Sequence, residues 1–67
     1  MNHFVFTSSA ENKVLEFDSK DEPPRVGQFI QLPFGPNKEL CRYRVMDVYV
    51  ETTGTDLTIY YYEVEPA

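Results

Sequence analysis

Residues 40–64 read LCRYRVMDVYVETTGTDLTIYYYEV, in which two segments rich in tyrosine and valine flank a hydroxyl-rich turn that contains Gly54. β-Branched and aromatic residues fit a pleated, half-buried surface, and glycine supplies the positive φ that a tight connection needs. The stretch therefore predicts a long β-hairpin that organises the rest of the chain.

The remainder of the chain is divided into short segments of strand-like composition. Strands are expected at residues 4–7, 14–17 and 28–32. Between them lie a polar turn, a charged segment that ends in two prolines, and a second segment broken by proline and glycine. Proline cannot donate a ladder hydrogen bond, so these segments are expected to be loops. We predict one all-β domain over residues 1–67, built as a small five-stranded barrel or a strongly bent antiparallel sheet with a long C-terminal hairpin.

The segments 25–30 (RVGQFI) and 43–48 (YRVMDV) resemble the strand rhythm of SH3-like small barrels. This resemblance covers about half of the chain. It implies a barrel-like shape and assigns no functional residues.

The apolar residues change phase within the first arm of the hairpin. Tyr43 and Val45 occupy odd positions, whereas Met46, Val48 and Val50 occupy even ones. A β-bulge near Met46 is one explanation. The other is a twisted ribbon that buries one face near its turn and the opposite face near its open end.

The second explanation is preferred, because a ladder without a bulge pairs residues well. With Val50 opposite Leu57, aliphatic residues face aliphatic residues, Arg44 faces Glu63, and the other arginine of the arm also faces a glutamate. Such pairs contribute roughly 0.2–1 kcal/mol each. A neighbour other than Glu63 across the ladder from Arg44 would refute this register.

Length and cysteine content limit how the domain is stabilised. A chain of 67 residues with Cys41 as its single cysteine forms no internal disulfide and has no Cys/His cluster for a structural metal. The sequence has neither a basic, apolar leader nor a long apolar run of membrane-spanning type. A cytoplasmic-type, reducing compartment and no membrane association are therefore expected, with packing as the source of stability.

The formal net charge of −5 is unevenly distributed. Residues 1–46 hold six acids and six bases, whereas residues 47–67 hold five acids and no base. Nucleic-acid affinity depends largely on Lys and Arg, so a nucleic-acid partner is disfavoured. The acidic segment either solubilises the domain or contacts a basic protein, and solubilisation is given the larger weight.

Candidate catalytic groups lack partners in the sequence. His3 is the single histidine and is expected to be a solvated terminal side chain, and Cys41 is expected to be a small buried hydrophobe. The paired acids lie in an exposed loop or beside arginines, and no phosphate loop, metal-ligand spacing or nucleophile motif is present. We predict no enzymatic activity, no cofactor and no metal.

Consecutive tyrosines at 60–62 must point to alternate faces, so at least one is expected to be exposed. In the preferred register Tyr60 shares a face with Tyr49 and Asp47, forming a patch of the kind enriched in protein interfaces. An alternative of equal weight is that these tyrosines only stabilise the sheet. Phe34, between a proline and a glycine, either closes one end of the barrel or contacts a partner.

These observations predict a non-enzymatic protein-interaction or accessory module, with Tyr49, Tyr60, Asp47 and Phe34 as candidate partner-binding residues and with a homodimer as one open alternative for the partner. One alternative is a small barrel that binds nucleic acid by stacking bases on aromatic rings. Another is an acidic mimic of DNA that occupies the groove of a DNA-binding protein.

Overall fold

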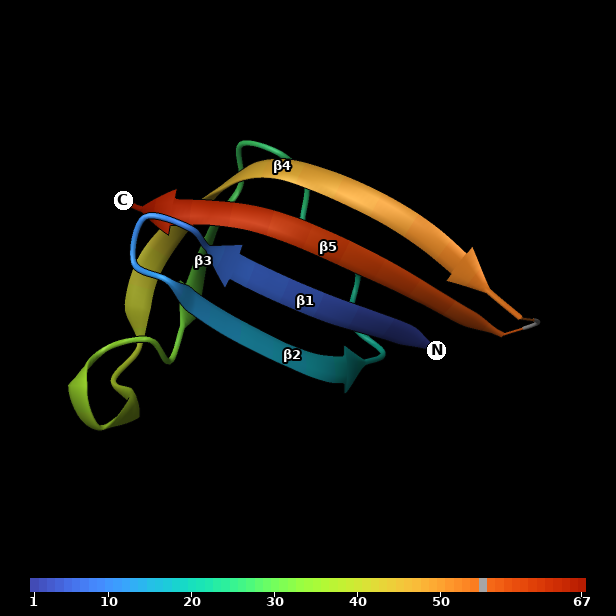
Figure 1. Cartoon of the computed structure of the whole chain (residues 1–67), viewed down its shortest axis with the longest axis horizontal. Helices are drawn as coiled ribbons and strands as arrows, with labels where there is room; N and C mark the ends of the chain where they lie inside the picture. The colour runs from blue at the N-terminus through green and yellow to red at the C-terminus, as the bar shows by residue number, and fades with distance from the viewer. Residues whose placement is uncertain (55) are drawn as a thin grey trace.

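A computed structural model describes residues 1–54 and 56–67 as one curled sheet of five strands (Figure 1). The strands are β1 (Asn2–Ser8), β2 (Lys13–Ser19), β3 (Phe29–Leu32), β4 (Cys41–Thr53) and β5 (Leu57–Pro66), with one 3₁₀ turn at Pro36–Lys38. Their order across the sheet is β2-β1-β5-β4-β3. The all-β prediction is thus confirmed, as is the long C-terminal hairpin formed by β4 and β5. One difference is that β1 lies parallel to β5, so the sheet is mixed.

The first hairpin follows from alternation and turn chemistry. Phe4 and Phe6 point to the inner, concave face, and Val5 between them points outward. After Ser8 the chain reverses through a turn in which the Glu11 N–H donates to the Ser8 carbonyl at 3.2 Å. Asn12 then adopts φ 56°, a left-handed conformation that asparagine tolerates better than most residues. The predicted polar turn is confirmed.

The core lies on the concave face of the sheet. Rings from β1 and β5 pack together there: Phe6 stacks on Tyr62 with centroids 4.9 Å apart, and Phe4 meets Tyr60 edge to face at 5.7 Å. Burying an apolar side chain of this size stabilises a fold by roughly 1.5–3 kcal/mol. The buried apolar residues are Phe4, Phe6, Leu32, Phe34, Tyr43, Val45, Tyr62 and Val64.

A β-bulge interrupts β4 at Met46. Val45 lies opposite Val64, and the next paired residue, Asp47, lies opposite Glu63, which leaves Met46 as the extra residue. Arg44 consequently neighbours Glu65 across the ladder and not Glu63. The preferred register without a bulge is therefore wrong, and the bulge explains the change of phase.

The bulge also keeps apolar residues on one side of a long strand. Val45 and Val48 both reach the concave face. They are three positions apart, and an odd spacing would place them on opposite faces of a regular strand, but the extra residue at the bulge shifts the alternation by one position. A bulge also increases local twist, which suits the strongly curled sheet.

Two strands end the sheet without meeting. β2 and β3 are its edges, and the open side of the half-barrel lies between them (Figure 1). One end of this seam is bridged, because Lys13 Nζ donates to the carbonyl oxygen of Phe34. The loop between β2 and β3 is held by the Tyr62 hydroxyl, which donates to the Pro24 carbonyl at 2.9 Å.

Candidate functional site

Two tyrosines lie side by side on the outer, convex face of the long hairpin. Tyr49 on β4 and Tyr61 on β5 are directly opposite each other, with ring centroids 6.0 Å apart. Their exposed fractions are 63% and 38%. An exposed aromatic pair of this kind offers apolar contact area together with two hydroxyl groups.

Carboxylates surround this pair along the same face. Asp47 and Glu51 flank Tyr49 on β4, and Glu63 lies opposite Asp47. Glu63 is held toward the first hairpin, because its two oxygens accept hydrogen bonds from the Ser9 N–H at 3.0 Å and the Ser9 hydroxyl at 2.8 Å. We call Asp47, Tyr49, Glu51 and Tyr61 the hairpin surface.

Beyond the bulge, one edge of β4 is free. β3 pairs with residues 41–44 only, and in the described part of the chain no strand covers residues 47–53 on that side. The Val48 N–H donates to its neighbour's carboxylate, Asp47 Oδ1, at 2.9 Å. Since amide groups alternate in direction along an antiparallel strand, those of Val50 and Thr52 are expected to face the same free edge. The edge can therefore pair with an added strand, except at the Val48 N–H, which already donates to Asp47.

The sequence-predicted site is divided by the structure. Tyr49 and Asp47 lie on the convex face, whereas Tyr60 lies on the concave face, stacked on Tyr62 at 6.2 Å. The predicted common face of Tyr49 and Tyr60 is wrong, because Val50 lies opposite Tyr60 instead of Leu57. A shift of three residues is odd, and an odd shift exchanges the two faces of a strand.

Phe34 is buried and packs edge to face on Tyr43 at 5.3 Å. Of the two predicted roles, closing one end of the barrel is the one that this position fits. Sequence reasoning missed Tyr61 and Glu51. The signal that could have found Tyr61 was the change of apolar phase at Met46, had it been interpreted as a bulge.

Basic side chains gather at the other end of the same convex face. The guanidinium of Arg42 lies 4.2 Å from the ring centroid of Phe29. The predicted charge pairs of Arg42 and Arg44 do not form: in residues 1–54 and 56–67, the basic side chains within 4.0 Å of a carboxylate are those of His3 and Arg25. Both arginines are exposed.

Four further titratable groups, His3, Cys41, Tyr43 and Tyr62, make contacts within the fold. His3 Nδ1 lies 2.6 Å from Asp18 Oδ1, so it is paired rather than solvated as expected. Cys41 is partly buried and packs against the core, as predicted. Burial raises the pKa of Tyr43 to about 12, with a further contribution from its hydrogen bond to Glu11, and burial likewise raises the pKa of Tyr62 to about 12. These two hydroxyls stay protonated at neutral pH.

Neither a metal site nor a membrane-spanning helix is found in the described chain. No group of three or more His, Cys, Asp or Glu side chains in residues 1–54 and 56–67 is arranged to hold a metal ion. In the same residues, no helix is long and apolar enough to cross a membrane.

No protein-family model, curated protein or solved structure matches this chain.

Proposed function

We propose that this protein is a non-enzymatic interaction or accessory module that binds a basic protein partner through the hairpin surface. The exposed pair of Tyr49 and Tyr61 is the observation that carries this proposal. Tyrosine is enriched where proteins bind one another, because its ring buries a large area at a small cost in side-chain entropy. A role only in the sheet would not require the ring of Tyr49 to be mostly exposed.

The charge of the surrounding surface selects the class of partner. Residues 47–67 carry five acids and no base. A basic partner is attracted to this field, whereas a second copy of the chain presents the same acids and is repelled. A heterologous partner is thus favoured over a homodimer, and an acidic mimic of DNA is the variant in which that partner is a DNA-binding protein.

The free edge of β4 provides a second means of attachment. An extended segment can add to such an edge through backbone hydrogen bonds, and side-chain contacts then give specificity. Lysines or arginines on that segment would face Asp47 and Glu51, which lie beside the tyrosines on the convex face. The proposal places the domain in a cytoplasmic-type compartment, where its single thiol, Cys41, stays reduced.

The test compares two exposed residues of the convex face that lie on strands separated by β1 and β5. Partners are captured from the native host with the unaltered protein, identified and purified. Their binding to the unaltered protein, to Tyr49→Ser and to Val14→Ser is then measured by calorimetry. Val14 is an exposed apolar residue on β2. Tyr49→Ser should weaken binding at least about tenfold, as expected for an interface hot spot. Val14→Ser should leave it unchanged. Equal affinities for all three proteins would remove the hairpin surface from consideration.

A second candidate function is binding of single-stranded nucleic acid at the basic end of the convex face. The observation in its favour is that Arg42 and Arg44 are exposed without a carboxylate partner in residues 1–54 and 56–67, next to the ring of Phe29. Bases could stack on that ring while the arginines contact phosphates. Retardation of an oligonucleotide at low salt that is lost in Arg42→Gln would favour this function, and no retardation would exclude it.

A further inference from the structure

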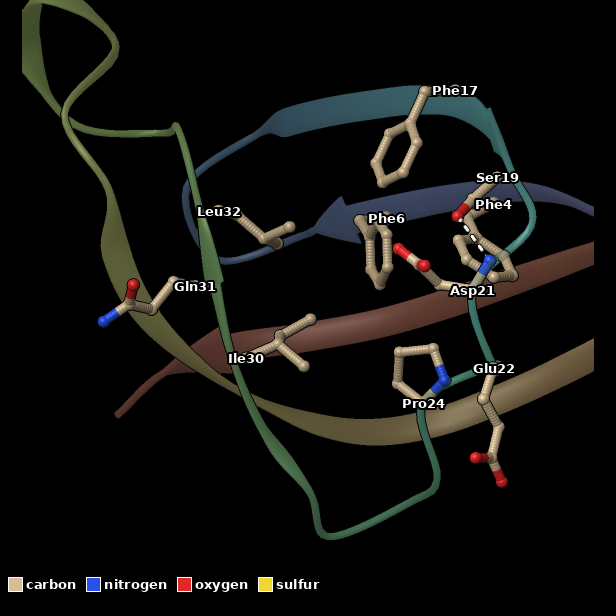
Figure 2. Close-up of a pocket in the computed structure, with 10 residues that line it drawn as sticks. All are labelled: Phe4, Phe6, Phe17, Ser19, Asp21, Glu22, Pro24, Ile30, Gln31 and Leu32. Carbon is tan, nitrogen blue, oxygen red and sulfur yellow. Dashed lines mark hydrogen bonds between the residues drawn. The ribbon is translucent and has the colours of Figure 1, made fainter.

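The open side of the half-barrel contains a cleft that the hairpin surface does not include. It has a volume of about 200 Å³ and lies between the edge strands β2 and β3 (Figure 2). The loop that follows β2 forms its third side. Its lining residues are Phe4, Phe6, Phe17, Ser19, Asp21, Glu22, Pro24, Ile30, Gln31 and Leu32.

The walls of this seam cleft are apolar and aromatic. Phe17 stacks on Phe6 with centroids 5.9 Å apart and meets Phe4 edge to face at the same distance. Although it contacts these two core rings, Phe17 remains 41% exposed. Ile30 and Leu32 form the opposite wall from β3 (Figure 2). A ring left this exposed on the concave side indicates space that the chain itself does not fill.

A carboxylate stands at the rim of this apolar space. Asp21 lines the cleft, and its backbone is fixed by an N–H donated to the Ser19 hydroxyl at 2.9 Å (Figure 2). In residues 1–54 and 56–67, no Lys, Arg or His nitrogen forms an ion pair with Asp21. The neighbouring Glu22 differs, since it lies 3.8 Å from Arg25. Among the described residues, the carboxylate beside the aromatic wall therefore has no ion-pair partner.

We propose that the seam cleft receives a lysine or arginine side chain from an extended segment of a protein partner. The aliphatic stem of such a side chain would lie against Phe17 and Ile30, and its cationic head would meet the Asp21 carboxylate and the face of an aromatic ring. A cationic occupant is complementary both to this rim and to the net charge of −5.

The size and surroundings of the cleft favour a side chain over a free small molecule. Sites for drug-sized ligands occupy about 300–1,000 Å³, more than this cleft provides. Both of its long walls are edge strands of the sheet, so a peptide backbone lying along the seam could form hydrogen bonds with them. This site is separate from the hairpin surface, and its test does not depend on that proposal.

The test is an NMR titration of the ¹⁵N-labelled protein with three probes. The first is the acetylated, amidated peptide Val-Thr-Lys-Thr-Val, the second carries norleucine in place of lysine, and the third is n-butylammonium. The lysine peptide should shift the amide signals of Phe17, Asp21 and Ile30 saturably and bind about tenfold more tightly than the norleucine peptide. n-Butylammonium should bind more weakly, because it lacks the backbone groups.

Two variants separate charge at the cleft from charge in general. Asp21→Asn should reduce the affinity for the lysine peptide to that of the norleucine peptide. Glu16→Gln makes the same change of net charge on the convex face of β2 and should change the affinity by less than about twofold at moderate salt. Phe17→Leu should weaken binding about threefold, since it keeps apolar volume but removes the ring face.

Three results would overturn the proposal. Equal affinity for the lysine and norleucine peptides would show that the cleft does not select a cation. Binding of n-butylammonium as tight as that of the peptide would show that the occupant is a free amine. No saturable shift at about 10 mM peptide, a concentration that detects even millimolar affinity, would show that the cleft is not a binding site.

Discussion

Replacing Val45 by alanine should destabilise this protein far more than the same change five residues along the strand. Val45 is 0% exposed and lies opposite the buried Val64, whereas Val50, on the same strand, is 49% exposed. The substitution removes two methyl groups, each worth about 0.8 kcal/mol of transfer free energy. The space left in a packed core adds a further cost, so Val45→Ala should lower the free energy of unfolding by about 2–3 kcal/mol.

This loss is large for so small a domain. At the usual 0.05–0.15 kcal/mol per residue, a 67-residue chain is stable by roughly 3–10 kcal/mol. A decrease of 2–3 kcal/mol corresponds to a fall of about 10–20 °C in melting temperature. Val50→Ala should cost less than about 0.5 kcal/mol, because much of its side chain already contacts water.

The two variants are compared by urea denaturation followed by circular dichroism. The urea dependence should have the same slope in both, since both unfold the same surface, and only the midpoint should differ. Equal midpoints for Val45→Ala and Val50→Ala would refute the assignment of Val45 to the core next to the bulge.

Two further predictions concern buried groups. Because the pKa values of Tyr43 and Tyr62 are raised to about 12, the stability that their protonated forms contribute is complete below the ordinary tyrosine pKa of 10.0 and is lost as the pH rises through about 12. Absorbance of tyrosinate and circular dichroism should therefore change together in that range, and ionisation of all tyrosines without loss of structure would contradict the burial. Gly35→Ala should destabilise by about 1–3 kcal/mol, because its Cβ would lie 2.8 Å from the Cys41 sulfur. In urea denaturation, Cys41→Ala in the same chain should recover part of this loss, and no recovery would assign the strain elsewhere.

The existence of the strands was predictable from local sequence, and their register was not. Alternation and turn residues place Phe4 and Phe6 on a strand and a reversal after Ser8, because these features depend on neighbouring residues alone. The register of the long hairpin depends on whether Met46 is paired or bulged. Each cross-strand contact contributes about 0.2–1 kcal/mol. Their sum does not decide between a paired and a bulged Met46 unless the face that meets the core is known.

The candidate sites were predictable only where they did not depend on the register. Tyr49 and Asp47 were found because they lie on a strand that the sequence makes obvious, but Tyr61 was missed with the register. The seam cleft had no local signal. One of its sides is the loop that contains Pro24, which Tyr62 holds through a contact between residues far apart in sequence.

The parallel pairing of β1 with β5 has a consequence for folding during synthesis. β1 lies in the interior of the sheet, and Phe4 acquires its neighbour Tyr60 only after nearly all of the described chain has been made. Until then β1 has only β2, and an isolated two-stranded hairpin is marginally stable in water. The high contact order of this topology predicts slow folding that begins late on the ribosome, so a nascent chain stalled before β5 should remain open to proteases and chaperones.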